Sequence, residues 1–346
     1  MTLAERRVRT LQAPQVLHHS RDLILPALHD AVLRLDPSMR SVVSYHLGWS
    51  DENGEPAEAD GGKAVRPGLA LLSAEAGRAP REVGVPGAVA VELVHNFSLV
   101  HDDVMDHDET RRHRRTVWAV WGTSTAILAG DAMLSLAHEV LLDPELEHGE
   151  AAGRLLASAT RELIRGQVQD LAFESRADVS LDACLDMAAG KTGALLSASA
   201  AVGAVLADAS PAVVEALAAY GSHLGIAFQL VDDLLGIWGD PAVTGKPVFS
   251  DLRARKCTLP VTYVLEQGGS QGRLLAELLT DPSERSDQDL AAAADLVESG
   301  GGRRWAQTET GHRAELAEQA LDSAPIPPDI VAELLQLGRF LVSREA

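Results

Sequence analysis

GAVAVELVHNFSLVHDDVMD, residues 87–106, is the stretch that most directly sets the fold. At about 100° per residue it places His95, Ser98, Asp102 and Asp106 on one narrow polar stripe, and aliphatic residues cover the other faces. This pattern predicts a long helix that is packed in a core and presents one polar stripe to an open space. The same helical period recurs along nearly the whole chain, whereas the alternation typical of strands is almost absent.

The composition favours the same fold class. The chain has 346 residues, of which 46% are hydrophobic but only 4% aromatic. Alanine and leucine, which favour helices, dominate the hydrophobic residues, and the aromatic residues that favour strands are few. We therefore predict an all-α protein, a single large helical bundle around a central cavity that forms one domain over residues 1–346. Its motifs lie in residues 61–260, and its C-terminal helices in residues 266–346. We expect helices at about 16–35, 63–78, 84–106, 122–143, 150–173, 180–206, 211–236, 256–267, 273–280, 287–299, 303–322 and 327–343.

Charge and cysteine content restrict the partners and the compartment. The net charge of −20 predicts repulsion from nucleic acid and from anionic membranes. Cys184 and Cys257 are far apart in sequence and lack metal-site spacing, so we expect reduced thiols in a cytoplasmic protein. The N-terminus has no apolar leader. The uncharged run 192–207 is too short to cross a bilayer, so we expect no transmembrane segment.

Two acidic motifs lie on predicted helices. Asp102 and Asp106 are one turn apart beside Asp103, where like charges repel. A solvated acidic patch would explain one such motif, but Asp232 and Asp233 form a second in the very apolar stretch LGIAFQLVDDLLGIWGD, residues 224–240. Mg²⁺ binds through one or two carboxylates together with substrate phosphates. Two acidic helices facing each other across a cavity could therefore hold Mg²⁺ ions between them.

Basic residues supply the complementary charge for phosphates. Four arginines follow the first acidic motif, in RRHRR, residues 111–115. GGKAVRP, residues 61–67, starts a predicted helix, where backbone N–H groups favour anions. Each further lysine alone would be an ordinary surface residue, but together with the arginines they indicate sites for two polyphosphates. The candidate residues in these motifs are Lys63, Arg66, Arg111, Arg112, Lys191, Lys246 and Lys256.

The ordered motifs resemble those of the trans-isoprenyl diphosphate synthases, or polyprenyl synthetases. They read GGKxxRP, ELVHxFSLxHDDxMDxDxxRR, AILAGD, GQxxDL, KTG, FQxxDD, GK and DL…K, and they extend from Gly61 to Lys256. The resemblance implies an all-α homodimer that joins isopentenyl diphosphate head to tail to an allylic diphosphate. It is strongest to the geranylgeranyl diphosphate synthases.

The same resemblance assigns roles to individual residues. It implies three Mg²⁺ ions held against the allylic diphosphate, with Asp102, Asp106 and Asp232 as the most direct ligands among Asp102, Asp103, Asp106, Asp232 and Asp233. The allylic diphosphate would contact Arg111, Lys191, Lys246 and Lys256. Isopentenyl diphosphate would contact Lys63, Arg66, His95 and Arg112. Thr192 and Gln229 would direct oxygen dipoles at the allylic carbocation.

The chain departs from the family pattern at four positions. Gly236 replaces the third acid of the second motif, and Ala64 replaces an arginine that is common after Lys63. Arg115 occupies the place of a frequent proline, and Cys257 that of a second basic residue. We expect these departures to affect affinity more than activity.

Product length depends, by the same resemblance, on residues just before the first aspartate. Ser98, four residues before it, is small, whereas relatives that stop at C15 commonly have an aromatic residue there. Phe97, five before it, is rotated by about 140° from Asp102 and would equally suit core packing. An aromatic residue at this position without an insertion in DDxxD is typical of C20 relatives. We therefore expect geranylgeranyl diphosphate, with farnesyl (C15) or C25 diphosphate as alternatives.

Two other functions are compatible with parts of the pattern. A class I terpene cyclase shares DDxxD, but its second motif needs a Ser and a Glu that DDLLGIWGD lacks. A non-catalytic partner subunit of a synthase would tend to lose metal ligands and to carry CxxxC pairs, whereas here the aspartates are present and the cysteines are separate.

Overall fold

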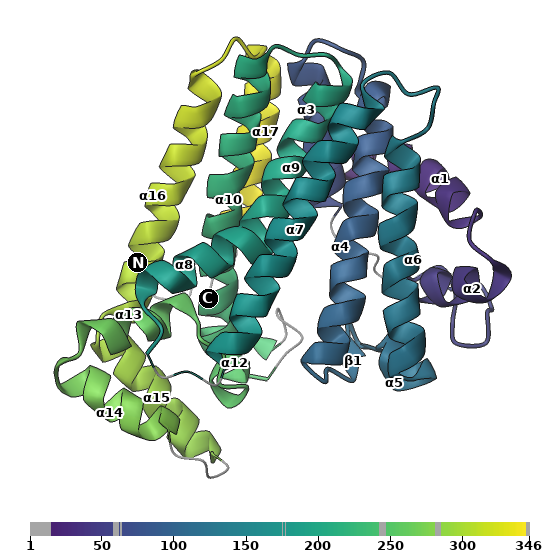
Figure 1. Ribbon diagram of the computed structural model, residues 1–346. Helices are drawn as coiled ribbons and strands as arrows, with labels where there is room; N and C mark the ends of the chain where they lie inside the picture. Colours follow the sequence, from purple (N-terminus) through teal and green to yellow (C-terminus); the bar gives the residue numbers. More distant parts are fainter. Residues whose placement is uncertain are drawn as a thin grey trace, which may run out of the picture.

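A tall bundle of helices forms the body of the protein (Figure 1). The computed structural model describes residues 15–57, 62, 64–174, 176, 178–241, 247–280 and 285–343. Its α-helices are α1 (Gln15–Val32), α2 (Pro37–His46), α3 (Val65–Ala76), α4 (Val85–Met105), α5 (Val117–Trp121), α6 (Thr123–Leu141), α7 (Gly149–Phe173), α8 (Leu181–Ala188), α9 (Ala194–Leu206), α10 (Pro211–Trp238), α12 (Ser250–Arg253), α13 (Leu259–Gln267), α14 (Gly269–Thr280), α15 (Asp287–Ser299), α16 (Gly302–Asp322) and α17 (Pro328–Val342). A 3₁₀ turn, η1 (Arg81–Gly84), precedes α4, and a π-helical turn, η2 (Ala189–Gly193), joins α8 to α9.

The predicted all-α class is confirmed. The strands that the structure shows among its described residues are β1 (Thr110–Arg111) and β2 (Arg114–Arg115), which pair antiparallel in one short hairpin. The long predicted helices are present, mostly with ends within a few residues of those expected. The short helices α2 and α5 were not predicted, because ten and five residues are too few for a clear helical period.

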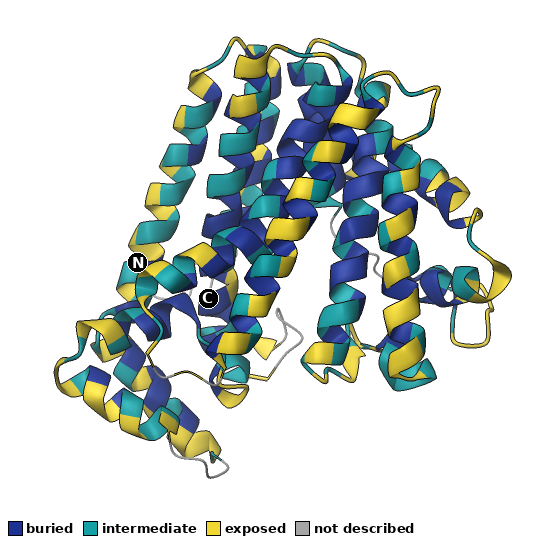
Figure 2. Ribbon diagram, in the orientation of Figure 1, coloured by how far each residue is buried: buried dark blue, intermediate teal, exposed yellow. Residues whose placement is uncertain are grey.

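Small residues let the central helices approach closely. A side chain at Gly203 of α9 would come within 2.0 Å of the Ala70 carbonyl oxygen on α3. A side chain at Gly221 of α10 would come within 2.4 Å of the Leu196 carbonyl oxygen on α9. The centre of the bundle is correspondingly buried along α3, α4 and α9 (Figure 2). This packing fixes α4 and α10, the helices that carry the acidic motifs.

Two stretches are long and apolar enough to cross a membrane by length and composition alone. They are Arg81–Met105 and Leu181–Leu206, and 61% and 72% of their most apolar windows are buried inside the protein. Their apolar side chains therefore belong to the core of the bundle.

One end of the bundle gathers the segments that carry the motifs. The end of α4, the hairpin that contains β1, and α12 lie at the lower end in Figure 1. The C-terminal ends of α7 and α10 also lie towards this lower end (Figure 1). Residues that are more than 100 positions apart in sequence are thus brought to a common region.

Candidate active site

The first acidic motif forms the last turn of α4. Asp102 and Asp106 are partly exposed, whereas Asp103 is only 1% exposed and turns inward. Arg111 Nε donates to Asp103 Oδ1 at 2.7 Å. The β1–β2 hairpin presents Arg111, and its turn residues Arg112 and His113 have φ values of 50° and 62°. Asp103 therefore positions the hairpin, whereas Asp102 and Asp106 stay partly exposed at the end of the bundle where the motifs meet.

Burial raises the pKa values of two of these carboxyls, those of Asp102 and Asp103. The pKa of Asp102 is raised mainly by burial and further by the neighbouring Asp106 carboxylate, although Lys191 and Arg111 oppose the shift. Burial raises the pKa of Asp103 to about 6 even though Arg111 lowers it. Carboxyls that resist ionisation when no cation is bound are suited to release protons when a divalent cation arrives.

The second acidic motif, on α10, likewise has one buried and one exposed aspartate. Asp233 is buried and accepts hydrogen bonds from the Leu259 N–H and from Gln229 Nε2, both at 2.8 Å. Burial raises its pKa to about 8. Asp232 lies on the exposed side of the helix. Thr192 Oγ1 donates to Gln229 Oε1 at 2.7 Å, which joins the motif on α10 to η2.

Asp251 stands beside the position of the missing third acid. A side chain at Gly236 would come within 1.9 Å of Asp251 Oδ2, so the Asp251 carboxylate lies directly against this glycine. The glycine that the sequence shows as a loss thus makes room for a carboxylate from α12. The motif DL…K contained Asp251, but we had assigned it no role.

Two lysines pair with carboxylates in this region. Lys256 Nζ, just before α13, lies 2.9 Å from Asp106 Oδ2 on α4. Burial disfavours the charge of Lys256, but the carboxylates of Asp106 and Asp170 outweigh it and raise its pKa. Lys191 pairs with Asp170 on α7. The sequence motif GQxxDL contained Asp170, a second carboxylate that we had not singled out.

The π turn explains how Lys191 and Thr192 reach this region. The sequence predicted one continuous helix over 180–206, whereas the structure interrupts it at η2 with an i→i+5 turn. Gly166 on α7 permits this, because a side chain there would come within 2.2 Å of the Lys191 backbone nitrogen. Gln167, next to it, is buried and has no hydrogen-bond partner for either amide atom. A buried amide without partners needs a ligand or a water molecule.

A second group of cations surrounds His95. Burial, followed by the charges of Arg66 and Arg112, lowers the pKa of His95 well below its usual value, so the imidazole is neutral. Arg66 Nε is buried without a hydrogen-bond partner. Gly62, at φ +95°, would place a side chain 2.8 Å from Arg112 Nη2, so Gly62 lies against the arginine hairpin. These observations fit an anion that would complete the group.

Two supporting residues complete this second group. His46 Nε2 lies 3.0 Å from Asn96 Oδ1, and Asn96 Nδ2 donates to Glu92 Oε1 at 3.1 Å. Burial and then the charges of Arg111 and Arg112 lower the pKa of His46 to about 3. The charge of Arg66 lowers the pKa of Glu92, although burial raises it overall. We had not singled out His46 or Glu92 from the sequence.

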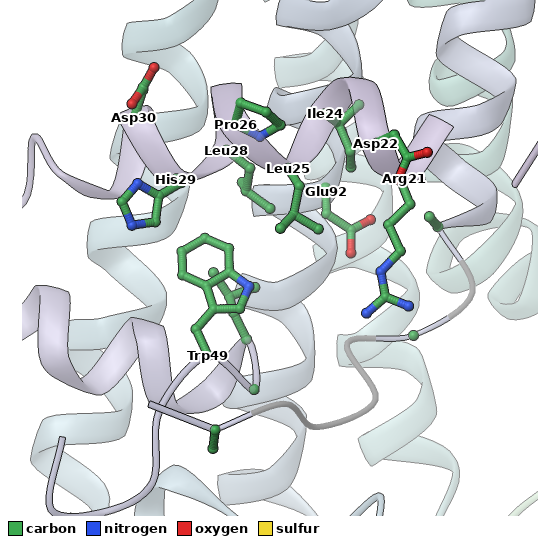
Figure 3. A pocket seen from close by; sticks show the side chains of 15 residues that line it. Arg21, Asp22, Ile24, Leu25, Pro26, Leu28, His29, Asp30, Trp49 and Glu92 are labelled. Atoms are coloured by element: carbon green, nitrogen blue, oxygen red, sulfur yellow. The ribbon is translucent and has the colours of Figure 1, made fainter. Parts of the chain in front are cut away.

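A cavity of about 750 Å³ adjoins this cation group. It lies between α1, the segment after α2, and α4 (Figure 3). Trp49 and Leu25 form part of its apolar wall, and Glu92 reaches it from α4 (Figure 3). Its lining among the described residues includes Gly62 and Ala64 but none of the five aspartates, so it borders the second cation group and not the acidic motifs.

The chain-length residues take different directions on α4. Phe97 is 5% exposed, and its ring meets His101 at 4.9 Å, on the side of α4 where His101 lies 3.0 Å from the Ile127 carbonyl of α6. Ser98 is also buried, and its hydroxyl donates to the His95 carbonyl at 2.8 Å. Their effect on product length stays a prediction. Lys63 and Lys246, which we also expected at the site, lie outside the described residues.

The arrangement fits Mg²⁺ shared with a diphosphate. Among the described residues, no three His, Cys, Asp or Glu side chains form a self-sufficient metal cluster. Mg²⁺ usually takes only one or two protein carboxylates and uses substrate phosphates for the rest. Asp102, Asp106 and Asp232 offer such carboxylates. Two groups of cations lie near them, namely Lys191 and Lys256 with Arg111, and the second cation group around His95. A helical bundle with these features defines a class of protein that binds diphosphates through a divalent metal.

The comparisons with known proteins identify the family. Residues 50–297 match the family model for polyprenyl synthetase. A (2E,6E)-farnesyl diphosphate synthase of Mycobacterium tuberculosis is 59% identical over 96% of this chain and 93% of its own length. A geranylgeranyl diphosphate synthase of the same species is 43% identical over 92% of this chain and 91% of its own length. The chain belongs to the polyprenyl synthetase family.

Solved structures agree with this assignment. A polyprenyl synthetase from Streptomyces coelicolor superposes with a TM-score of 0.92 at 50% identity and covers 96% of this chain and 100% of its own. A geranylgeranyl pyrophosphate synthase from Corynebacterium glutamicum, complexed with isoprenyl diphosphate and magnesium, gives 0.83 at 28% identity, with 97% and 100% covered. The protein is therefore a prenyltransferase of the prenyl diphosphate synthase type, a family that uses Mg²⁺ to bind diphosphates.

Proposed function

We propose that this protein condenses isopentenyl diphosphate with allylic diphosphates to form geranylgeranyl diphosphate, the all-E C20 product. The observation that carries the condensation is the pairing of two separate cation groups with two acidic helices. Arg66, Arg112 and neutral His95 form one group, and the lysines Lys191 and Lys256 stand beside the acidic motifs. Two diphosphate substrates require two such groups, whereas a cyclase, which uses one diphosphate, requires only one.

The second cation group, around His95, holds isopentenyl diphosphate in this proposal. Arg66 Nε supplies a buried donor that lacks a partner, and Lys63 would add a charge from the same motif. The neutral imidazole of His95 donates a hydrogen bond without adding positive charge beside the arginines. Fixing this substrate next to the allylic one removes most of the entropy cost of bringing two molecules together.

The cations beside the acidic motifs act on the leaving group. Arg111, Lys191, Lys246 and Lys256 stabilise the negative charge that grows on the allylic diphosphate as its C–O bond breaks, which favours the transition state over the ground state. Asp102, Asp106 and Asp232 would hold Mg²⁺, in our proposal three ions, and Asp103 and Asp233 orient them. When bound, Mg²⁺ neutralises the diphosphate charge and improves it as a leaving group.

In this proposal, Thr192 and Gln229 stabilise the allylic carbocation. Their hydrogen bond fixes both oxygen dipoles, and Asp233 holds the Gln229 amide from the other side. The double bond of isopentenyl diphosphate then attacks the cation. The departed diphosphate accepts the final proton, so no nucleophilic side chain is needed.

Two observations bear on product length. The aromatic Phe97, the small Ser98 and a first motif without insertion support C20. The relative that is 59% identical over most of both chains is a farnesyl diphosphate synthase, which supports C15 as the second candidate. These candidates differ by one condensation cycle on the same site.

A product assay tests both the condensation and the length. The purified protein is incubated with isopentenyl diphosphate and dimethylallyl, geranyl or farnesyl diphosphate, with Mg²⁺ or with EDTA, and the dephosphorylated products are resolved by length. We expect a Mg²⁺-dependent C20 alcohol, a shorter product from Ser98→Phe and a longer one from Phe97→Ala. A C15 product from the wild type would select the second candidate. No elongation from any starter would favour the partner-subunit hypothesis, and a hydrocarbon from one diphosphate would favour a cyclase.

We also propose a cytoplasmic homodimer. Leu128 and Ile127 on α6 are 57% and 43% exposed, and large apolar side chains at a surface are typical of a covered interface. The net charge of −20 agrees with a protein that does not bind anionic membranes or nucleic acid. Light scattering in solution should give twice the chain mass, and a monomer would contradict the dimer.

A further inference from the structure

The two cysteines, far apart in sequence, meet in the structure. Cys184 lies on α8 and Cys257 in the segment between α12 and α13. Cys184 Sγ donates to the Cys257 carbonyl oxygen at 3.2 Å, which places the Cys184 thiol directly against the residue that carries the other thiol. The sequence had indicated separate thiols because 73 positions divide them. Both sulfurs are free in this structure.

The segment that contains Cys257 touches both acidic motifs. Lys256 Nζ, one residue earlier, lies 2.9 Å from Asp106 Oδ2 of the first motif. The Leu259 N–H, two residues later, donates to Asp233 Oδ2 of the second motif at 2.8 Å. Any displacement of Cys257 therefore moves a cation of the site and a hydrogen bond that orients the second motif.

The two thiols differ in the way that thiol–disulfide chemistry requires. Cys184 is fully buried, whereas Cys257 is partly exposed and accessible to a small oxidant. The neighbouring Cys184 thiol and Thr262, whose Oγ1 is 3.2 Å from Cys257 Sγ, lower the pKa of Cys257 to about 7. Interaction with Cys257 and burial raise the pKa of Cys184. A thiolate at Cys257 is thus the attacking group, and Cys184 is the resolving thiol.

We propose that Cys184 and Cys257 form an oxidation site that a peroxide converts into a disulfide, and that this disulfide impairs the neighbouring Lys256. The Cys257 thiolate attacks one peroxide oxygen, and the O–O bond breaks. The departing oxygen is protonated and leaves as one water molecule, and Cys257 becomes a sulfenic acid. The Cys184 thiol then attacks the Cys257 sulfur, an S–S bond forms, and the hydroxyl leaves with a proton as a second water. Two electrons pass from the thiols to the peroxide.

The disulfide must change the geometry of the segment. Bonded sulfurs lie about 2.05 Å apart, closer than any hydrogen-bonded pair, so the segment of residues 256–259 is drawn towards α8. Lys256 then loses its position beside Asp106. We expect a reduced kcat and a raised KM for the allylic diphosphate, while the KM for isopentenyl diphosphate changes little because its cation group lies elsewhere. This inference rests on the family's condensation reaction but not on the proposed C20 length.

The experiment treats the full-length protein with hydrogen peroxide and then removes the excess with catalase. Intact-mass measurement, free-thiol counting and kinetics with each substrate varied are made before and after dithiothreitol. We expect a loss of two hydrogen masses, both free thiols consumed, at least a threefold fall in kcat for condensation, and recovery on reduction. In Cys184→Ala, a sulfenic acid at Cys257 should react with dimedone instead, and no intramolecular disulfide should form.

Three outcomes would overturn the proposal. These are two free thiols after oxidation, a disulfide without a change in kcat or in the KM for the allylic substrate, or equal inactivation of the wild type and of the matched control Cys184→Ala/Cys257→Ser. Inactivation of that double variant would place the oxidised group elsewhere. A wild type that is inactive before oxidation would refute the proposed function, whereas a disulfide could still be measured by mass.

Discussion

The two acidic motifs divide their carboxylates in the same way but anchor them differently. On α4, Asp103 is buried against the guanidinium of Arg111. On α10, Asp233 is buried against two neutral donors, the Leu259 N–H and the Gln229 amide. In each motif the remaining aspartates are more exposed. We therefore propose that the second aspartate of each pair is a positioning residue, and the two motifs differ in whether a charge or a dipole holds that aspartate.

This difference has a physical consequence. A charged partner compensates a buried carboxylate more fully than two neutral donors do. Burial is the largest cause of both shifts, and it raises the pKa of Asp103 to about 6 against the opposing charge of Arg111 but that of the more deeply buried Asp233 to about 8 against two neutral donors. Without metal, the α4 motif is held by an ion pair at neutral pH, whereas the α10 motif retains a proton at its anchor.

The largest expected effect is a loss of kcat when an exposed aspartate of either motif is removed. Asp102→Ala and Asp232→Ala should each lower kcat at least about a thousandfold, because a lost metal ligand removes several kcal/mol of transition-state stabilisation. Steady-state assays with saturating Mg²⁺ measure this effect. Asp208→Ala, at a carboxylate that is 80% exposed, is the control and should keep full activity. Activity within tenfold of wild type in either motif variant would exclude a direct ligand there.

The next effect compares the two anchors. Arg111→Leu leaves a buried carboxylate without its charge partner and should lower the free energy of unfolding by about 3 kcal/mol. Gln229→Leu removes only one neutral donor and should cost about 1 kcal/mol. Urea unfolding at neutral pH without metal measures both. Asp103→Asn in the Arg111→Leu background should restore part of the loss, and equal costs for the two single variants would show that the anchors do not differ.

The smallest effect is a pH dependence of stability. At pH 6–8 without metal, folded Asp233 keeps a proton that the unfolded chain releases, because its folded pKa of about 8 exceeds the ordinary aspartate pKa of 3.8. This contribution stabilises the fold at low pH and is lost as the pH rises through the folded pKa, by about 1 kcal/mol per pH unit. Asp233→Asn should remove the slope in urea unfolding series. Asp103→Asn should leave it between pH 7 and 8, since the Asp103 transition is centred near 6.

Much of the fold and of the site could be predicted from local patterns. The apolar faces of α4 and α10 have a clear helical period, so the sequence predicted correctly that both acidic motifs lie on helices. The hairpin of residues 110–115 was missed because its strands are two residues long, and the π turn at Lys191 was missed because a single such turn interrupts the helical period of its flanks only locally. Asp170 and Asp251 were missed as site residues because neither belongs to a paired acidic motif.

The sequence by itself determined the helical class, the family and the exposed aspartates, because each depends on residue types at short, fixed spacings. Only the tertiary structure decided which partners these residues have. Arg111 turns to Asp103, Lys256 reaches Asp106 across 150 positions, Asp251 occupies the space beside Gly236, and Cys184 meets Cys257. Such contacts depend on how closely packed helices place distant segments. Helical periodicity specifies which face of a helix a residue occupies, but it contains no information on what lies opposite.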